Sequence, residues 1–154
     1  MHVQLAHGHV AFAHVCASRE SDAAFVALLD ACRPSGGLAR ADELLARWRA
    51  AAHDGAAPTP RLAHWIAGGH ALSFRWANAH WLPRFQFEWP RAHLRPGMAP
   101  VLAELQPLLE PWELAQWFTT PNGWLRQCTP AETLRSDWRA VRDAARADRF
   151  SLRG

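Results

Sequence analysis

A thiol and an imidazole stand close together near the N-terminus, where Cys16 follows His14 by two positions. Such a pair becomes a nucleophile when it is held in a fixed geometry that lowers the thiol pKa. The flanking residues fix no such geometry, so inert thiols are the favoured interpretation. The chain also has no glycine-rich phosphate loop, no Gly-x-Ser-x-Gly elbow and no His-Glu-x-x-His helix, and its carboxylates are spread singly. We therefore predict a protein without catalysis.

The histidines of the chain are possible ligands of a metal ion. All nine His precede residue 94, and four of them form a loose N-terminal cluster. These four are His2, His7, His9 and His14. Metal ligands are usually held on rigid elements with supporting hydrogen bonds, whereas residues 1–20 show no helical period. We therefore expect no functional metal site and no cofactor.

Basic residues gather in the middle of the chain. Between Arg61 and Gly97 there are five Arg and one acid, Glu88. A short helix at 60–67 followed by a β-hairpin is the outline of a winged-helix DNA reader, whose hairpin rests on phosphates. The candidate DNA-contacting residues are Arg61, His64, Arg75, Arg84, Arg91 and Arg95. Because the helix carries no Asn or Gln, specific base recognition is disfavoured, and a solvated basic hairpin is the alternative.

Composition bounds the class of protein. The 154 residues are 49% hydrophobic and 20% charged with a formal net charge of +3, which is typical of one globular domain or two very small ones. No run approaches 18 apolar residues, so we expect no membrane span, and the N-terminus lacks a secretory pattern. Three scattered cysteines indicate reduced thiols and a cytoplasmic protein. We expect most of the nine Trp to fill the core.

Hydrophobic periodicity predicts a mostly α fold. We expect helices after a Ser21 N-cap, over 38–52 and over 60–67, and in most of the chain from Pro96 onward. The last helix is expected to end at about Arg149. Further N-caps are predicted at Thr120, Thr129 and Ser136, and the one at Thr129 fits a capping box.

One segment changes to a period of two. Apolar residues alternate over 72–87, which predicts a β-hairpin with an aromatic face and with Pro83 in an edge strand. The chain is then divided into a flexible lead-in (1–20), a helical or winged-helix-like region (21–80) and a small helical domain (81–154).

Three short motifs follow one another in the C-terminal half. LPRFQF occupies residues 82–87, WFTTPNGWL 117–125 and TPAETL 129–134, and an Ala-rich helix follows. This order resembles the toxin-binding domain of the Xre/MbcA/ParS antitoxin family over nearly half of the chain. The family usually has a Gly between the second and third motifs, where residues 126–129 have none, so we expect that turn to differ.

The resemblance implies a non-catalytic antitoxin whose partner is a toxin with a RES domain, which consumes NAD or transfers its ADP-ribose. It implies that the C-terminal part docks at the entrance of the toxin's active site. The family signature falls on Trp117, Pro121, Asn122, Trp124, Leu125, Pro130 and Leu134. We expect the prolines and Leu134 to be caps or core contacts, and Asn122 and Trp124 to lie at the surface.

The tail after Ala145 is the second part of the expected toxin contact. Its arginines would reach carboxylates of an NAD pocket and Phe150 would fill the nicotinamide slot, although a frayed basic terminus is the alternative. The candidate toxin-binding residues are therefore Trp117, Asn122, Trp124, Leu125, Arg146, Arg149, Phe150 and Arg153. A DNA-binding regulator, acting alone or as an autorepressor, is the second functional hypothesis and an enzyme is the third. Members of the family commonly form homodimers.

Overall fold

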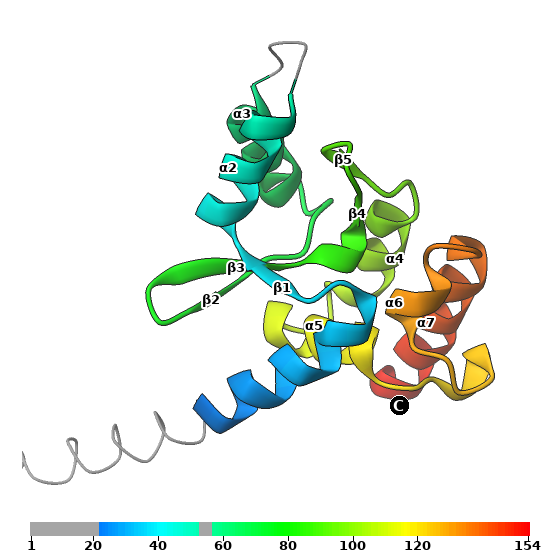
Figure 1. Cartoon of the computed structure of the whole chain (residues 1–154). Helices are drawn as coiled ribbons and strands as arrows, with labels where there is room; N and C mark the ends of the chain where they lie inside the picture. Colours follow the sequence, from blue (N-terminus) through cyan, green and yellow to red (C-terminus); the bar gives the residue numbers. More distant parts are fainter. Residues whose placement is uncertain (1–21, 53–56) are drawn as a thin grey trace, which may run out of the picture.

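A computed structural model describes residues 22–52 and 57–154 (Figure 1). The expected lead-in, the Ser21 cap, the His14–Cys16 pair and the N-terminal His cluster lie outside the described residues. The described part is mainly helical with a small antiparallel sheet. The predicted fold class, mostly α with one β-hairpin, is confirmed.

The N-terminal half alternates helices and short strands. Its elements are helix 22–32, the 3-10 turn η1 (Arg33–Ser35), β1 (Leu38–Arg40), α2 (Ala41–Ala51), α3 (Pro58–Ala67), β2 (Phe74–Trp76) and β3 (Ala79–Pro83). The C-terminal half begins with a second small sheet and continues as helices. Its elements are η2 (Arg84–Gln86), β4 (Phe87–Glu88), β5 (His93–Leu94), α4 (Met98–Leu105), α5 (Pro111–Thr119), η3 (Gly123–Leu125), α6 (Pro130–Thr133) and α7 (Trp138–Arg153).

The predicted hairpin is β2–β3, and it forms a three-stranded sheet of order β1-β3-β2. Its two-residue turn puts Ala77 and Asn78 at φ of 47° and 59°, the backbone that twists correctly between antiparallel strands. The edge position predicted for Pro83 is wrong, because β3 is the central strand and Pro83 pairs with Leu38. Proline is tolerated there because it is the last residue of β3, after which η2 interrupts the predicted second strand.

The sheet separates two hydrophobic clusters. Side chains such as Leu38 and Phe74 pack against helix 22–32 and the C-terminal helices, whereas Ala39 and Leu82 pack against α2 and α3. Figure 1 shows α2 and α3 above the sheet and helix 22–32 below it. The order of elements fits a winged helix, but in this chain helices cover both faces. The first cluster also joins residues on both sides of the predicted boundary between residues 80 and 81.

Three predicted helix starts are wrong. Leu38 begins β1 and not a helix, because backbone pairing with β3 takes precedence over its apolar period. The helix α3 starts at the buried Pro58, two residues before Pro60, since proline suits the first helical turn. Thr120 caps no helix, because the chain stays extended there until Asn122 caps η3.

The last helix also differs from its prediction at both ends. Its N-cap is Asp137, not Ser136, and the Asp137 carboxylate accepts the backbone N–H of Ala140 at 3.0 Å. The helix continues to Arg153, beyond the expected end near Arg149. By contrast, the capping box of Thr129 is present, and its hydroxyl accepts the backbone N–H of Glu132.

The buried side-chain amide of Gln86, in the LPRFQF motif, connects Leu72, which precedes β2, to Pro83 at the end of β3. Gln86 is fully buried, and its side chain both accepts the N–H of Leu72 and donates to the carbonyl of Leu72, each at 2.8 Å. It also donates to the carbonyl of Pro83 at 2.9 Å. All these groups would be costly to bury without partners. Gln86 is therefore a structural residue in this chain.

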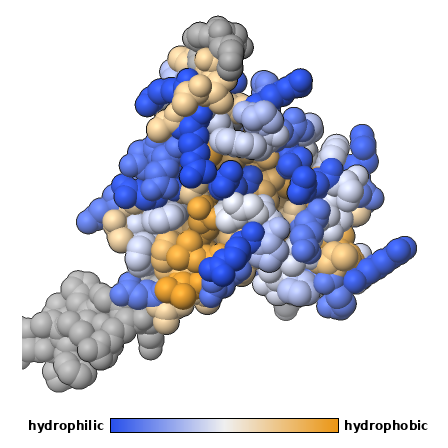
Figure 2. Space-filling view, in the orientation of Figure 1, coloured by the Kyte–Doolittle hydropathy of each residue, from blue (hydrophilic) through white to orange (hydrophobic). Residues whose placement is uncertain are grey.

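Among helices α2 to α7, the contact between α4 and α7 is the most extensive. The apolar face of α4, with Val101, Leu102 and Leu105, lies against the small residues Ala144 and Ala145 of α7. Elsewhere, Figure 2 shows apolar surface over helix 22–32, where Val26 is exposed.

The N-terminus of α4 allows a test of this packing. A Cβ added at Gly97 would lie 2.2 Å from Cβ of Trp138, whereas one added at Gly123 would meet nothing closer than 3.7 Å. We expect Gly97→Ala to lower the free energy of unfolding by about 1–3 kcal/mol, measured by urea titration. Gly123→Ala is the control, and equal effects of the two substitutions would contradict the close α4–α7 packing.

Candidate protein-binding surface

One carboxylate on α7 organises the segment that carries the second motif. Asp148 Oδ2 accepts the indole N–H of Trp117 and the amide N–H of Asn122, both at 2.8 Å. Asp148 Oδ1 accepts the indole N–H of Trp124 at 3.2 Å. We call these four residues the Asp148 cluster. They draw α5, η3 and α7 together around a single anionic group.

The turn around η3 presents Trp124. Asn122 accepts the backbone N–H of Trp124 through its side chain at 2.9 Å, while its own backbone N–H donates to the carbonyl of Cys128. Arg126 and Gln127 follow at φ of 56° and 67°, a conformation that costs non-glycine residues about 1–2 kcal/mol each. Between the second and third motifs, where the family usually has a Gly, Arg126 and Gln127 thus adopt the left-handed conformation.

The four signature residues predicted to bind a toxin occupy different depths. Trp124 is 67% exposed, as expected. Asn122 is buried, so its predicted surface position is wrong, because its side chain is used to cap η3 and to reach Asp148. Leu125 lies in the core, and Trp117 is half-buried against it. Among the expected structural residues, Pro130 and Leu134 are buried whereas Pro121 is exposed.

The tail residues are not a loose basic segment. Arg146 binds Glu104 of α4 at 2.7 Å, and Arg149 binds the other oxygen of Glu104 at 2.9 Å. Phe150 and Arg153 are exposed on the same helix. Because Phe150 follows Asp148 by two positions, it points about 200° around α7 from the Asp148 cluster. Arg146 and Arg149 therefore serve the α4–α7 contact.

The basic residues of the predicted DNA-binding region are dispersed. Arg61 donates to the carbonyl of Ala92 at 3.3 Å, and His64 is exposed on α3. Arg75 lies exposed on β2, and Arg91 is exposed in the loop between β4 and β5. Arg84 and Arg95 instead line one cavity, together with Arg135.

Groups suited to catalysis are scattered in the described part of the chain. Burial raises the pKa of the Cys32 thiol to about 12, and Cys128 is exposed. His80 and Glu110 line one open hollow with Arg75, but no cysteine does. Across residues 22–52 and 57–154, no three or more His, Cys, Asp or Glu side chains are grouped so as to hold a metal ion. Within those ranges no helix has the length and apolar character to cross a membrane.

The sequence analysis missed Asp148 and Glu104. Asp148 had a recognisable signal, since it continues the buried stripe of Val141, Ala144 and Ala145 at helical spacing. A carboxylate at the next position of an apolar stripe indicates that polar donors face it. Glu104 gave no such signal, because its partners lie more than 40 positions away in the sequence.

Replacing Asp148 tests the cluster. Asp148→Asn removes the charge and puts an amide donor among three N–H donors, so we expect a loss of about 1–3 kcal/mol in the free energy of unfolding. Asp143→Asn on the same helix is the control, because Asp143 pairs with Arg142 at the surface and its replacement should change stability by about 0.5 kcal/mol or less. Urea denaturation measures both, and an Asp148 effect as small as the control would refute the cluster.

Comparisons with known protein families, curated proteins and solved structures find no match for this chain. The Asp148 cluster is therefore interpreted from its own chemistry. The resemblance to the antitoxin family rests on the three motifs alone, and it stays a prediction.

Proposed function

We propose that this chain is a non-catalytic, antitoxin-like protein that binds and neutralises a RES-type toxin, which consumes NAD or transfers its ADP-ribose. The observation that carries the proposal is Trp124, whose side chain is 67% exposed while its indole N–H is fixed on Asp148. Exposed tryptophans with restricted motion are typical anchors of protein interfaces. The three motifs supply the class of partner.

Trp124 is organised for binding before a partner arrives. Its backbone N–H is held by Asn122 and its indole N–H by Asp148, so the ring has little freedom left to lose. Ordering a mobile side chain costs about 0.5–1.5 kcal/mol on association. The same carboxylate also satisfies the ring's only polar group, which leaves its apolar face for the partner.

The end of α7 supplies a second contact. Phe150 is 66% exposed and Leu152 is also exposed. Because Phe150 and Asp148 lie on opposite sides of α7, a toxin that touches both Trp124 and Phe150 encloses the end of the helix. Arg146 and Arg149 are bound to Glu104, so Phe150 takes the leading part in the proposed contact of the tail. Phe150 remains the group that can enter an apolar slot of the toxin.

The experiment is co-expression with a RES-domain toxin from the neighbouring reading frame. Trp124→Ala should weaken toxin binding by at least about 2 kcal/mol, near thirtyfold, because truncating an aromatic anchor costs that much. Affinity is measured by calorimetry, and cell growth and NAD level report neutralisation. Trp89→Ala is the matched control, since Trp89 is 49% exposed and lies outside the Asp148 cluster.

Two outcomes would contradict the proposal. Full protection by a folded Trp124→Ala variant would show that Trp124 is not needed for toxin binding. If the unaltered chain does not bind the neighbouring RES toxin, the proposed antitoxin function is wrong. Deleting residues 150–154 tests the second contact separately, because this truncation keeps both ion pairs to Glu104 and should reduce neutralisation without unfolding the chain.

The winged-helix order of elements favours DNA binding as a second candidate function. Along the chain the elements run in the order helix 22–32, β1, α2, α3, β2 and β3, and the strands pair in the order β1-β3-β2. The β2–β3 hairpin exposes Arg75 and His80. The exposed part of α3 offers His64 but no amide side chain. Binding through phosphates, with little dependence on base sequence, is the form that these residues suit.

The salt dependence of DNA binding tests this candidate. We expect Arg75→Gln to weaken binding of duplexes of any sequence and to reduce the slope of log affinity against log salt by about 1. Arg153→Gln, at the end of α7, is the control with the same loss of charge. Fluorescence anisotropy measures both, and no binding at low salt, or equal losses for both variants, would exclude the hairpin as a DNA contact.

A further inference from the structure

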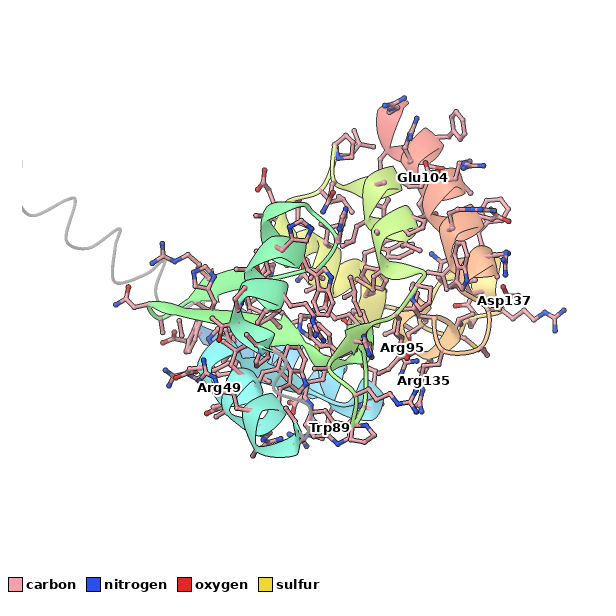
Figure 3. All side chains as sticks on the ribbon, turned by 90° about the horizontal axis from the view of Figure 1, so that it is seen from above. Arg49, Trp89, Arg95, Glu104, Arg135 and Asp137 are labelled. Atoms are coloured by element: carbon pink, nitrogen blue, oxygen red, sulfur yellow. The ribbon has the colours of Figure 1, made fainter. Side chains whose placement is uncertain are left out.

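A cavity of about 200 Å³ lies between the small second sheet and the turn that follows α6. Its base is apolar, with buried Leu44, Phe85 and Phe87. Three guanidinium groups line it, from Arg84, Arg95 and Arg135, and Trp89 and Gly36 complete the rim. Figure 3 shows Arg95 and Arg135 close together although they come from distant parts of the chain. We call these three the arginine triad.

The arginine triad has no anion of its own. Within residues 22–52 and 57–154, the ion pairs involve other arginines. No Asp or Glu lines the cavity. Glu88 raises the pKa of Arg95 but forms no ion pair with it, so the positive charges of Arg95 and Arg135 repel one another and a bound anion would relieve that repulsion.

A hydrogen bond to the backbone fixes Arg95 within the arginine triad. Its Nε–H donates to the carbonyl of Phe85 at 2.9 Å, which orients the two terminal nitrogens. Burial and the positive charge of Arg135 lower the pKa of Arg95, and Glu88 acts in the opposite sense. Both partial burial and the like charge of Arg135 therefore disfavour the charged form of Arg95, which a bound anion would stabilise.

Trp89 gives the cavity an aromatic wall. The Arg84 guanidinium lies 5.3 Å from the centre of the Trp89 ring, a cation–π distance that positions Arg84. Trp89 is half exposed, so its ring can also receive a planar group that projects from the cavity. A fork-shaped cation beside an aromatic face suits a phosphate that carries an organic base.

We propose that this cavity binds the phosphate group of a small molecule, held by the arginine triad, with an attached base resting on Trp89. The volume is below the range typical of whole drug-sized ligands, so it accommodates a phosphate and leaves the remainder of a nucleotide outside. A recess with an apolar base favours a small molecule over a nucleic-acid backbone. The site is separate from the Asp148 cluster and does not depend on toxin binding.

Calorimetric titration of the full chain with inorganic phosphate and with AMP tests the proposal at constant ionic strength. Arg135→Gln should weaken both ligands about tenfold or more, because it removes a charged hydrogen-bond donor from an exposed position that has no other partner in the described chain. Arg47→Gln is the control, because Arg47 is equally exposed and lies on α2 outside the cavity. Trp89→Leu distinguishes the two sources of phosphate.

The outcomes separate cleanly. Saturable binding that Arg135→Gln weakens and Arg47→Gln does not supports the site, and a further loss for AMP alone in Trp89→Leu assigns it to a nucleotide. If phosphate and AMP bind with equal affinity, both to the unaltered chain and to Trp89→Leu, the site is assigned to free phosphate. Non-saturable binding, or equal losses in Arg135→Gln and Arg47→Gln, would overturn the proposal. Tighter binding of a short DNA duplex than of AMP would also overturn it.

NMR spectroscopy of the unaltered chain keeps the test valid if a variant unfolds. Phosphate should shift the Nε–H resonance of Arg95 and the indole resonance of Trp89, and leave the indole resonance of Trp124 unchanged. Shifts spread evenly over exposed arginines would contradict a defined site.

Discussion

The contact between α4 and α7 fixes the positions on which the rest of the C-terminal region depends. Gly97 lets the start of α7 approach closely, and Ala144 and Ala145 let the two helices stay close along their length. Once α7 lies there, Glu104 can bind Arg146 and Arg149, and Asp148 faces α5 and η3. A shift of α7 by one residue would turn Asp148 by about 100° and leave its three donors without a common acceptor. Helix packing thus determines the exposed position of Trp124.

The sheet has a comparable role in the N-terminal half. Its alternation sends Leu38 and Phe74 to one cluster, and Ala39 and Leu82 to the other. The α2–α3 pair is thereby attached to the molecule through β1 and β3, and Gln86 holds the segment before β2 against the turn that ends β3. The same turn, η2, brings Arg84 to the cavity beside Arg95. The aromatic residues of the hairpin are therefore structural, since they pack against helix 22–32.

Local signals in the sequence predicted the local structure well. The capping box at Thr129 needed only neighbouring residues, and the period-two alternation identified the hairpin. Errors arose where distant residues decide. Leu38 joins a strand because β3 lies beside it, and the tail continues as a helix because Glu104 holds Arg146 and Arg149. Of the candidate site, the exposed Trp124 was predicted, and the apolar stripe of the last helix could have identified Asp148 as a buried carboxylate. Its pairing with Trp124 across 24 positions and the arginine triad, which comes from three separate segments, had no local signal.

The central claim is that Asp148 acts on a partner through Trp124, and a double-mutant cycle in toxin affinity tests it most directly. The cycle compares the unaltered chain, Asp148→Asn, Trp124→Ala and the double variant, each checked for folding. The account predicts that Asp148→Asn weakens binding when Trp124 is present and has little further effect once Trp124 is replaced, with a coupling energy of at least about 0.5–1 kcal/mol. Additive effects of the two substitutions would contradict it, because Asp148 would then act independently of the tryptophan that it holds.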